Sequence, residues 1–332
     1  MSKQNKRKHH FLPKCYLKNF ADLDKKIWAY RLEDPACPFQ RKYENFGHIR
    51  DYYSQLKPDG TTDYNLLEDF FDDNVESYWP TLITQIEYKE TLSPDQVMSL
   101  LKFMIAQRLR VPATRDLIEL CLAHHVKSVA EHLDSVGSLP QAPDGLQKDG
   151  KMDWDKIIVT IDPRQSLHRL VDLASSMSPI LDNIGYTIIL NNTNIPFITS
   201  DNPVCYYTPK NNKTFRPYTL TSLNHPIELV FPLTDKMCLL GLSSLKETFG
   251  HDGLSYTEAR NKISILDIND TISRFAYQFA YSKSLDNGEI IRRHSNVAPV
   301  PNFSSVRTGS KVYNAPQIVF GERPKKPKWQ GP

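Results

Sequence analysis

The chain has 332 residues and a formal net charge of +3, with hydrophobic and charged fractions of 40% and 24%. This composition excludes global disorder, because enough apolar side chains are present to bury a full core. The small net charge does not by itself indicate a nucleic-acid partner. Five cysteines are scattered without a Cys-x-x-Cys pair, which argues against a disulfide framework or structural zinc and fits a reducing cytoplasm.

Basic residues gather at both ends of the chain. No apolar run follows the basic first ten residues, so they are not a secretory signal, and no segment is long and apolar enough to span a membrane. We therefore expect a cytoplasmic protein without a membrane partner. Residues 1–8 are predicted to be a disordered basic arm, and residues 295–332 an extended, proline-rich basic tail. Such ends either attract phosphates or are simply solvated.

The first half of the chain has mainly helical periodicity. Ser93-Pro94-Asp95-Gln96 marks a helix start, because it combines a capping box with proline at the first helical position. Val111-Pro112 then breaks that helix, since the residue before a proline avoids the helical conformation. The expected elements are a helix at 13–20, a strand at 27–32, and helices at 64–88, 93–110 and 113–133.

The second half consists mostly of short runs of β-forming residues separated by turn residues. A run of helices followed by a run of strands predicts an α+β fold, with the helical N-terminal and middle part packed on a mostly antiparallel sheet from the C-terminal half. We expect a single domain over residues 9–294, with a sub-boundary near 136–152. The expected elements are a strand at 157–161, a helix at 163–183, strands at 186–190, 195–199, 228–231 and 237–242, and a helix at 267–281.

Three acids stack on one face of the predicted helix 64–88. Glu68, Asp72 and Glu76 are four residues apart, and Glu68 points close to the direction of the apolar side chains. Like charges at this spacing repel one another, and more strongly when water is removed. We therefore expect compensation by arginine, histidine or a divalent cation, unless the acids form a solvent-exposed face.

Three arginines surround the predicted break at Pro112. Periodicity turns Arg108 towards the core, whereas a kink at the proline is needed to redirect Arg110 and Arg115. Arginine makes two-pronged bonds to carboxylate or phosphate. The cluster therefore predicts either buried ion pairs with the acidic helix or a phosphate-binding site.

Two further segments carry polar side chains where ligands commonly bind. His9 and His10 precede a proline-started helix, where a histidine can bind an anion, coordinate metal or act as acid or base, unless the pair is simply exposed on the basic arm. Asp201 and Asn202 follow the apolar run 195–199, and a rigid strand end presents such side chains at an edge. Asp-Asn-Pro is also ordinary turn chemistry.

Several signature motifs are absent. The sequence has no Gly-x-x-x-x-Gly-Lys-Ser/Thr phosphate loop, no Rossmann glycine fingerprint, no His-Glu-x-x-His and no Gly-x-Ser-x-Gly elbow. ATP-driven and simple serine-hydrolase activities therefore lose most of their support.

The chain opens with His9-His10-Phe11-Leu12-Pro13-x-x-Tyr16-Leu17-x-x-Phe20 and a Lys26–Tyr30 strand, and later contains Glu68 and Glu76, Arg110-Val111-Pro112-x-x-Arg115, the segments 197–204 and 231–234, and a late helix with Asn269 and Tyr281-Ser282. Over roughly residues 9–285 these blocks resemble the uncharacterised bacterial family known as domain of unknown function 4238. The resemblance carries no activity. It favours Arg110 as an inward-facing arginine, and we keep Arg108 as a core ion-pair partner. It implies one grouping of side chains: His10, Glu68, Glu76, Arg110, Arg115 and Asp201.

This mixture of histidine, acids and arginines predicts a hydrolase, most specifically a phosphodiesterase or nuclease acting on nucleic acid or nucleotide with a divalent cation, Mg²⁺ or Mn²⁺. The alternative is a non-catalytic protein in which the same residues form a structural network or a nucleotide pocket, or which binds a partner through its basic tail. The residues assigned are His10, Asp201 and Glu76 for catalysis, Arg110, Arg115, His9 and Asn202 for substrate binding, and Glu68, Glu76 and Asp201 for the metal.

Overall fold

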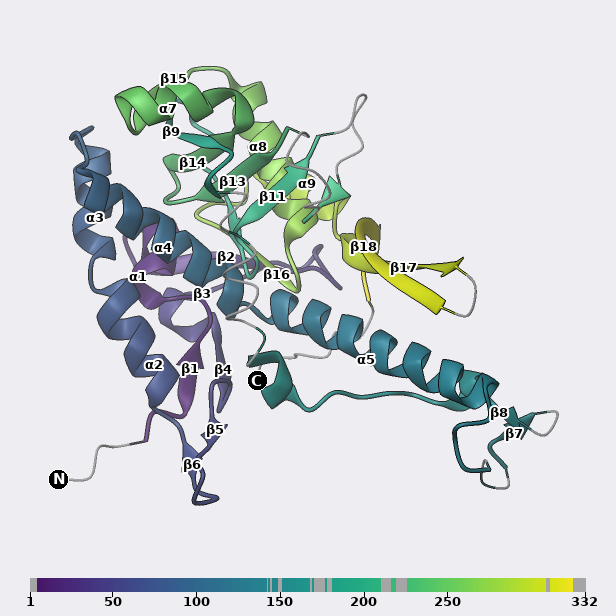
Figure 1. Cartoon of the computed structure of the whole chain (residues 1–332). Helices are drawn as coiled ribbons and strands as arrows, with labels where there is room; N and C mark the ends of the chain where they lie inside the picture. The colour runs from purple at the N-terminus through teal and green to yellow at the C-terminus, as the bar shows by residue number, and fades with distance from the viewer. Residues whose placement is uncertain are drawn as a thin grey trace.

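The chain folds as an α+β protein, as the computed structural model in Figure 1 shows. Helices occupy most of the N-terminal and middle part, and strands of mainly antiparallel sheets dominate the C-terminal half, which confirms the predicted class. Among the described residues, no helix is both long and apolar enough to cross a membrane. The structure describes residues 5–141, 143, 145–148, 151–167, 169, 177, 181–209, 216–218, 226–308 and 311–324.

The long helices begin and end where the local sequence dictates. α4 (Pro94–Arg110) starts at the predicted capping box, in which the Ser93 hydroxyl accepts the Gln96 N–H and the Gln96 side chain accepts the Ser93 N–H. It ends at Arg110, and after the single residue Val111, α5 (Pro112–Ser135) begins in a new direction. The other α-helices whose bounds lie within the described residues are α1 (Lys14–Leu17), α2 (Leu66–Phe71), α3 (Trp79–Glu87), α7 (Lys246–Asp252), α8 (Lys262–Phe275) and α9 (Gly288–Arg293).

Two sheets organise the strands. The larger has the order β12-β11-β13-β14-β9-β15, and all its pairings are antiparallel except that of β15 with β9. The smaller has the order β10-β16-β2-β3, so strands from the start of the chain pair with strands from its last third. Their bounds are β2 (Lys26–Arg31), β3 (Phe39–Lys42), β9 (Gly185–Asn191), β10 (Thr199–Ser200), β11 (Cys205–Thr208), β12 (Arg216–Pro217), β13 (Glu228–Pro232), β14 (Met237–Leu242), β15 (Ser255–Ala259) and β16 (Phe279–Ser282).

Among the described residues, four two-stranded antiparallel pairs accompany the two sheets. The pair nearest the candidate site joins the first motif block to the turn that follows β3. The pairs are β1 (Lys8–His10) with β4 (His48–Arg50), β5 (Gln55–Leu56) with β6 (Thr62–Asp63), β7 (Gln147–Lys148) with β8 (Lys151–Met152), and β17 (Val297–Thr308) with β18 (Lys311–Glu322).

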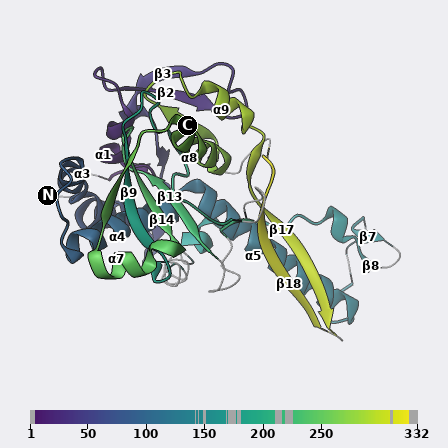
Figure 2. The same ribbon diagram turned by 90° about the horizontal axis from the view of Figure 1, so that it is seen from above.

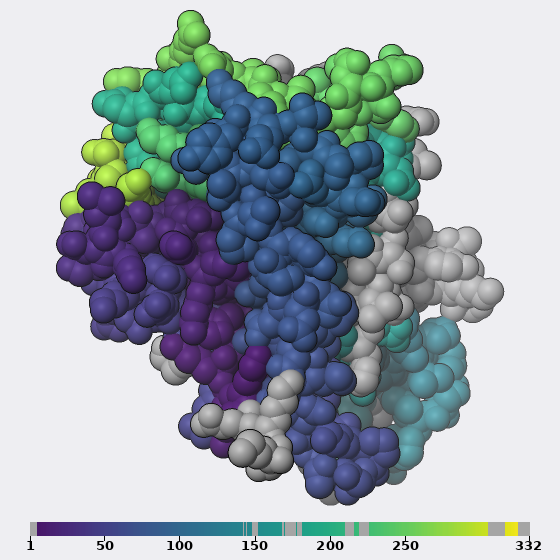
Figure 3. All heavy atoms as spheres, turned by 90° about the vertical axis from the view of Figure 1, so that its left-hand side faces the viewer, coloured from purple at the N-terminus to yellow at the C-terminus, as the bar shows by residue number. Residues whose placement is uncertain are grey.

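The first motif block is anchored in the core between helices and sheets. The Tyr16 ring stacks on Phe231 of β13 with centroids 5.6 Å apart. Its buried hydroxyl bonds the Thr199 hydroxyl at 2.7 Å and the Pro232 carbonyl at 2.9 Å, so no polar group is left unpaired there. Helices α2–α4 cover the face of the molecule seen in Figure 3, and the N-terminal segments pack beside them.

Two predictions in the helical half need correction. The predicted helix 64–88 is interrupted by a π-helical turn, Asp72–Glu76, between α2 and α3. Residues 157–161 form no strand, because no described strand lies beside them to share hydrogen bonds. Residues 163–167 are helical as predicted, and most of the rest of the predicted helix 163–183 lies outside the described residues.

The predicted strand at 195–199 and the last helix also have different bounds. Of the predicted strand 195–199, only Thr199 pairs with another strand, as the first residue of β10. The helix begins at Lys262 rather than at 267, because the Asn261 side chain accepts the N–H of Ile263 and caps it. It ends at Phe275, and residues 279–282 instead join the smaller sheet as β16.

Both predicted tails are more ordered than the sequence suggested. Residues 297–308 and 311–322 pair as the antiparallel strands β17 and β18 rather than forming an extended tail. The hairpin runs along α5, which projects from the body (Figures 1 and 2). At the other end, Arg7 pairs with Asp51 and Lys8 begins β1. Residues 1–4 and 325–332 lie outside the described chain, and the sub-boundary near 136–152 stays a prediction.

Candidate functional site

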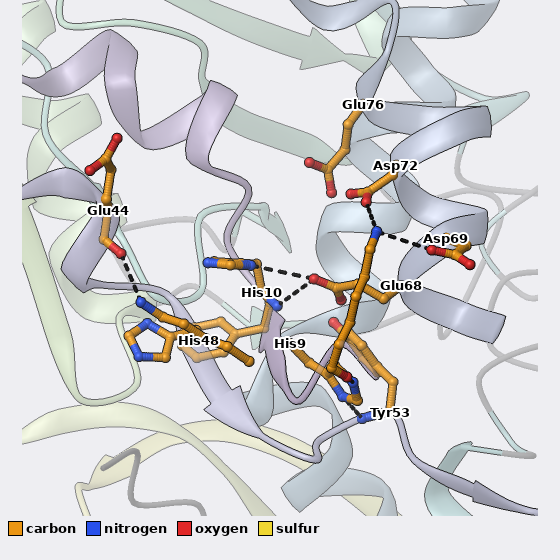
Figure 4. Close-up of polar contacts among 12 residues, drawn as sticks. His9, His10, Glu44, His48, Tyr53, Glu68, Asp69, Asp72 and Glu76 are labelled. Carbon is orange, nitrogen blue, oxygen red and sulfur yellow. Dashed lines mark hydrogen bonds and ion pairs between the residues drawn. The ribbon is translucent and has the colours of Figure 1, made fainter. Parts of the chain in front are cut away.

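The acids on α2 and the π-helical turn are compensated from the N-terminal segment (Figure 4). A carboxylate oxygen of Glu68 accepts the backbone N–H of His10 at 3.1 Å and lies 3.4 Å from Nδ1 of the same residue. The Lys6 ammonium bonds the carboxylate of Asp72. The compensation expected from the charge spacing is therefore confirmed, and it is supplied by protein side chains.

His10 is held by Glu68 but keeps one ring nitrogen free of described partners. Burial acts to raise the pKa of Glu68, but the hydrogen bonds from His10 outweigh it, so the pKa lies below its usual value. Glu68 is thus a carboxylate that fixes the His10 ring through Nδ1. The Nε2 atom of His10 is buried and bonds to no described residue.

His9 is a structural residue in this geometry. Its side chain is fully buried, and the ring stacks on Tyr53 with centroids 5.5 Å apart. Nδ1 accepts the backbone N–H of Tyr53 at 2.7 Å. Nε2 lies 2.7 and 2.8 Å from the carbonyl oxygens of Lys6 and Tyr64, so it carries the proton. Both nitrogens are occupied by backbone groups, which argues against the substrate contact predicted for His9.

Arg110 forms the predicted ion pair with the acidic face. Its guanidinium donates to Glu76 at 2.8 Å and to the carbonyl oxygen of Phe11 at 3.2 Å, and it lies 4.8 Å from the ring centroid of Phe71. Only 1% of the Arg110 side chain is exposed, against 18% for Glu76. Of the residues grouped by the resemblance, Arg110 and Glu76 therefore meet at Phe11, which follows His10 in the chain.

The other two arginines at the break have different partners. Arg115 donates to the carbonyl oxygen of Tyr52 at 2.8 Å and to the Ser166 hydroxyl at 3.0 Å, so it ties α5 to neighbouring segments and lies apart from the acidic face. Arg108 sits 3.8 Å from the ring centroid of Tyr218. The expected ion pair of Arg108 is thus not formed by the described residues, because an aromatic ring takes the place of a carboxylate.

Asp201 and Asn202 hold the turn that follows β10. The Asp201 carboxylate accepts the backbone N–H groups of residues 277–279 at 2.7, 2.7 and 2.9 Å. Burial raises the pKa of Asp201 to about 6, while these N–H groups and Arg323 act in the opposite direction. The Asn202 side chain donates to the Tyr218 hydroxyl and to a carbonyl oxygen, each at 2.7 Å. Both side chains thus tie the end of β10 to segments that are distant in the sequence, rather than making the local turn bonds that Asp-Asn-Pro also allowed.

The predicted metal site is not formed by its three carboxylates. Glu68 is bonded by His10, Glu76 by Arg110 and Asp201 by backbone N–H groups, so each is held by a different protein donor. Within the described chain, no three His, Cys, Asp or Glu side chains are grouped as a metal ion requires.

A cavity of about 320 Å³ lies where several of the motif blocks meet. Phe11 of the first block, Pro112 of the arginine block and Asp201 of the Asp-Asn-Pro turn all line it. The rest of its wall comes from β2, β3, the turn into β4, the segment around β16 and the end of β18. Segments from both ends of the chain therefore build one concave site.

Aromatic side chains form one wall of this cavity. The Phe46 ring contacts Phe39 and Tyr281 with centroid separations of 5.9 and 5.2 Å. Phe279 stacks on Tyr281 at 6.1 Å with the two rings almost parallel. These rings come from β3, the turn before β4, and β16, so neighbouring strands together contribute an aromatic cluster to the cavity wall.

Arginines provide most of the charge around the aromatic wall. The guanidinium groups of Arg31 and Arg41 lie 6.0 and 5.3 Å from the centroid of the same ring, Phe39. Arg323 reaches the cavity from the end of β18, and its guanidinium donates to the carbonyl oxygens of four residues, 276, 277, 295 and 297. Burial lowers the pKa of Arg323 to about 10. Two acids, Glu33 and Asp201, also line the site, so the cations exceed the acids by one.

Of the charged residues and histidine that line the cavity, sequence reasoning identified Asp201 but missed Glu33, His48 and the three arginines. Arg31 is the last residue but one of the predicted strand 27–32, which is a weak signal, whereas Arg323 belongs to the segment predicted to be an extended basic tail. His48 had no sequence signal. In the structure it lies on β4 opposite His10, and its Nδ1 donates to the carbonyl oxygen of Phe46 at 3.3 Å.

Comparison with known proteins gives one match. The family described as "Protein of unknown function (DUF4238)" matches residues 8–286, which confirms the resemblance seen in the motif blocks. No curated protein and no solved structure matches the chain.

Proposed function

The chain belongs to the DUF4238 family, and because that description carries no reaction, we propose a function from geometry: the cavity binds a nucleotide-like ligand, a flat ring that bears phosphate. The observation that carries this proposal is the combination, in one cavity, of a wall of four aromatic rings with three arginines. We place this activity in the cytoplasm, as five unpaired cysteines favour.

The chemistry of the lining side chains matches the two parts of such a ligand. A planar ring stacks on Phe and Tyr side chains by its faces and edges, and this contact is largely independent of sequence or ring type. Guanidinium groups bind phosphate oxygens in pairs, and Arg31 and Arg41 are already oriented by the ring of Phe39 that they share. A preoriented guanidinium loses less side-chain entropy on binding.

The size and charge of the cavity limit the ligand further. A volume of about 320 Å³ is at the lower end of typical ligand sites, which span roughly 300–1,000 Å³, so one nucleotide fits better than a dinucleotide. Glu33 is exposed and lies 4.0 Å from Arg31, and Asp201 is engaged by backbone N–H groups. Neither acid therefore fully neutralises the positive charge of the arginines at the place where a phosphate would bind.

Isothermal titration with AMP, adenosine and orthophosphate tests this proposal. AMP should bind more tightly than either of its parts, because only AMP uses the ring wall and the arginines together. Arg41→Gln should weaken AMP binding about tenfold, which corresponds to ~1.4 kcal/mol, and should leave adenosine binding unchanged. Arg260→Gln is the matched control, since Arg260 is exposed and does not line the cavity.

Two results would contradict the proposal. One is the absence of binding heat with millimolar AMP. The other is equal weakening by Arg41→Gln and Arg260→Gln, which would indicate general charge attraction rather than a site.

The second candidate function is hydrolysis of a phosphodiester, as the sequence predicted for His10, Glu76 and Asp201. The observation that favours it is the His10–Glu68 pair, which lies directly beside Phe11 at the cavity. Cleavage of RNA or DNA by the purified protein with Mg²⁺ or Mn²⁺, abolished by His10→Ala, is the expected result. Undiminished cleavage by that variant would remove the role of His10.

A further inference from the structure

We infer that His48 is the proton acceptor of a phosphodiesterase centre at the cavity wall, and that His10 and Glu68 position it from behind. This inference rests on the proposed ligand pocket and adds a reaction and its base. It moves the proton transfer from His10, which does not line the cavity, to His48, which does. Figure 4 shows Glu68, His10 and His48 following one another across β1 and β4.

Strand pairing fixes the two histidines relative to each other. His10 of β1 is the register partner of His48 of β4, and side chains at such cross-strand positions lie on the same face of the pair. Their ring centroids are 5.7 Å apart, with the ring planes inclined by 52°. Glu68 in turn holds His10 through both its backbone N–H and its Nδ1, so the ring that His48 packs against cannot rotate freely.

The hydrogen bonds of His48 prepare it to accept a proton. A carbonyl oxygen only accepts, so the bond from Nδ1 to Phe46 requires the proton on Nδ1 and leaves a lone pair on Nε2. No described residue bonds to that Nε2. The backbone at the neighbouring Gly47 has a positive φ of 68° and lies against Leu12, so the turn that carries the ring is closely packed.

Burial and the nearby positive charges favour the neutral form of His48. Burial lowers the pKa of His48, the Phe46 carbonyl opposes this, and Lys8, His10 and Lys14 lower the pKa further. The charged groups that line the cavity together with His48 are Arg31, Arg41, Arg323, Glu33 and Asp201. A bound phosphodiester adds negative charge to this surrounding, which favours the imidazolium form produced during the reaction.

The reaction uses water as its second substrate. Nε2 of His48 takes a proton from a water molecule while the water oxygen bonds to phosphorus. The bond between phosphorus and the leaving oxygen breaks, and that oxygen keeps the electron pair. The leaving oxygen then takes up a proton, either from the imidazolium or from solvent, and the products are a phosphate monoester and an alcohol. In the second case the imidazolium releases its proton to solvent, so His48 returns to its neutral form either way. Arg31 and Arg41 offset the charge that develops on the phosphoryl oxygens.

The test uses thymidine 5′-(4-nitrophenyl phosphate), whose leaving group departs without an acid, so its turnover isolates the base. His48→Ala should lower kcat at least about hundredfold while AMP binding changes less than threefold, and added imidazole should restore part of the rate. His10→Gln should lower kcat roughly tenfold with little change in KM, because the base is present but less well placed. His251→Asn, at an exposed histidine on α7, is the matched control.

The pH profile separates a positioning role from a structural one. The wild-type rate should fall below pH 6.5 as His48 becomes protonated, since its pKa lies below that ordinary value. His10→Gln should move this acid limb to higher pH, because it removes one of the groups that lower the pKa of His48. A loss of folded protein alone would reduce the rate by the same factor at every pH.

The possible results distinguish this inference from the proposed pocket. Tight AMP binding without turnover by the wild type overturns the catalytic inference and leaves the pocket intact. Undiminished turnover by His48→Ala, or a loss that imidazole does not restore, overturns the role of His48. Absence of AMP binding together with absence of turnover contradicts both.

Discussion

The buried pair of Arg110 and Glu76 gives the sharpest prediction about stability. Breaking a buried ion pair by removing one partner costs roughly 3–5 kcal/mol. Glu76 is 18% exposed, and Arg110 keeps the Phe11 carbonyl when Glu76 is lost, so we expect Glu76→Gln to cost less, about 2 kcal/mol. Arg110→Met should cost about 3–4 kcal/mol, because it removes the partner of Glu76 and a donor to Phe11 together.

Urea unfolding of the two single variants and the double variant measures the coupling directly. The double variant should cost little more than Arg110→Met alone, so the coupling free energy should be about 1.5–2 kcal/mol. Additive losses, with a coupling below about 0.5 kcal/mol, would refute the view that these side chains stabilise the fold as a pair. Full stability of both single variants with lost turnover would instead favour the catalytic role that the sequence assigned to Glu76.

Three further predictions concern groups around the site. The pKa of Glu68 is lowered in the folded protein, so this carboxylate contributes stability above pH 4.5 that is lost as the pH falls through the lowered value. In urea unfolding at decreasing pH, the difference in unfolding free energy between the wild type and Glu68→Gln should therefore shrink. Gly47→Ala should cost about 2–4 kcal/mol in thermal unfolding, because its Cβ would lie 2.6 Å from Cβ of Leu12, whereas Gly60→Ala, also at positive φ but in open space, should cost only about 1 kcal/mol. Asp201→Asn should destabilise by roughly 2–3 kcal/mol in the same assay, since an Asn side chain has one acceptor oxygen where the carboxylate uses two to accept three backbone N–H groups, and an unchanged melting temperature would contradict that role.

Local sequence signals predicted the parts of the fold that local interactions decide. The capping box at Ser93 and the break at Pro112 fix the bounds of α4 and α5, and both effects act over a few residues. The charge spacing of the acidic helix required compensation, but spacing alone did not identify Lys6 and His10 as its sources. Those pairs depend on where β1 lies, which is a tertiary property.

The cavity could not be predicted for the same reason. Arg41 and Arg323 are nearly three hundred positions apart in the chain and meet only because β2 and β3 join the sheet that contains β16, with the end of β18 beside it. Periodicity treats each helix as straight and separate, so it favoured Arg108 and an ion pair. The structure buries Arg108 against Tyr218 because α4 ends beside the larger sheet.

A crystal structure of the protein soaked with AMP tests the central claim most directly. The account predicts ligand density in the 320 Å³ cavity, with the adenine ring against the wall that contains Phe46 and the phosphate within hydrogen-bond distance of Arg31 or Arg41. An empty cavity at an AMP concentration tenfold above the measured Kd, or density at another surface, would contradict it.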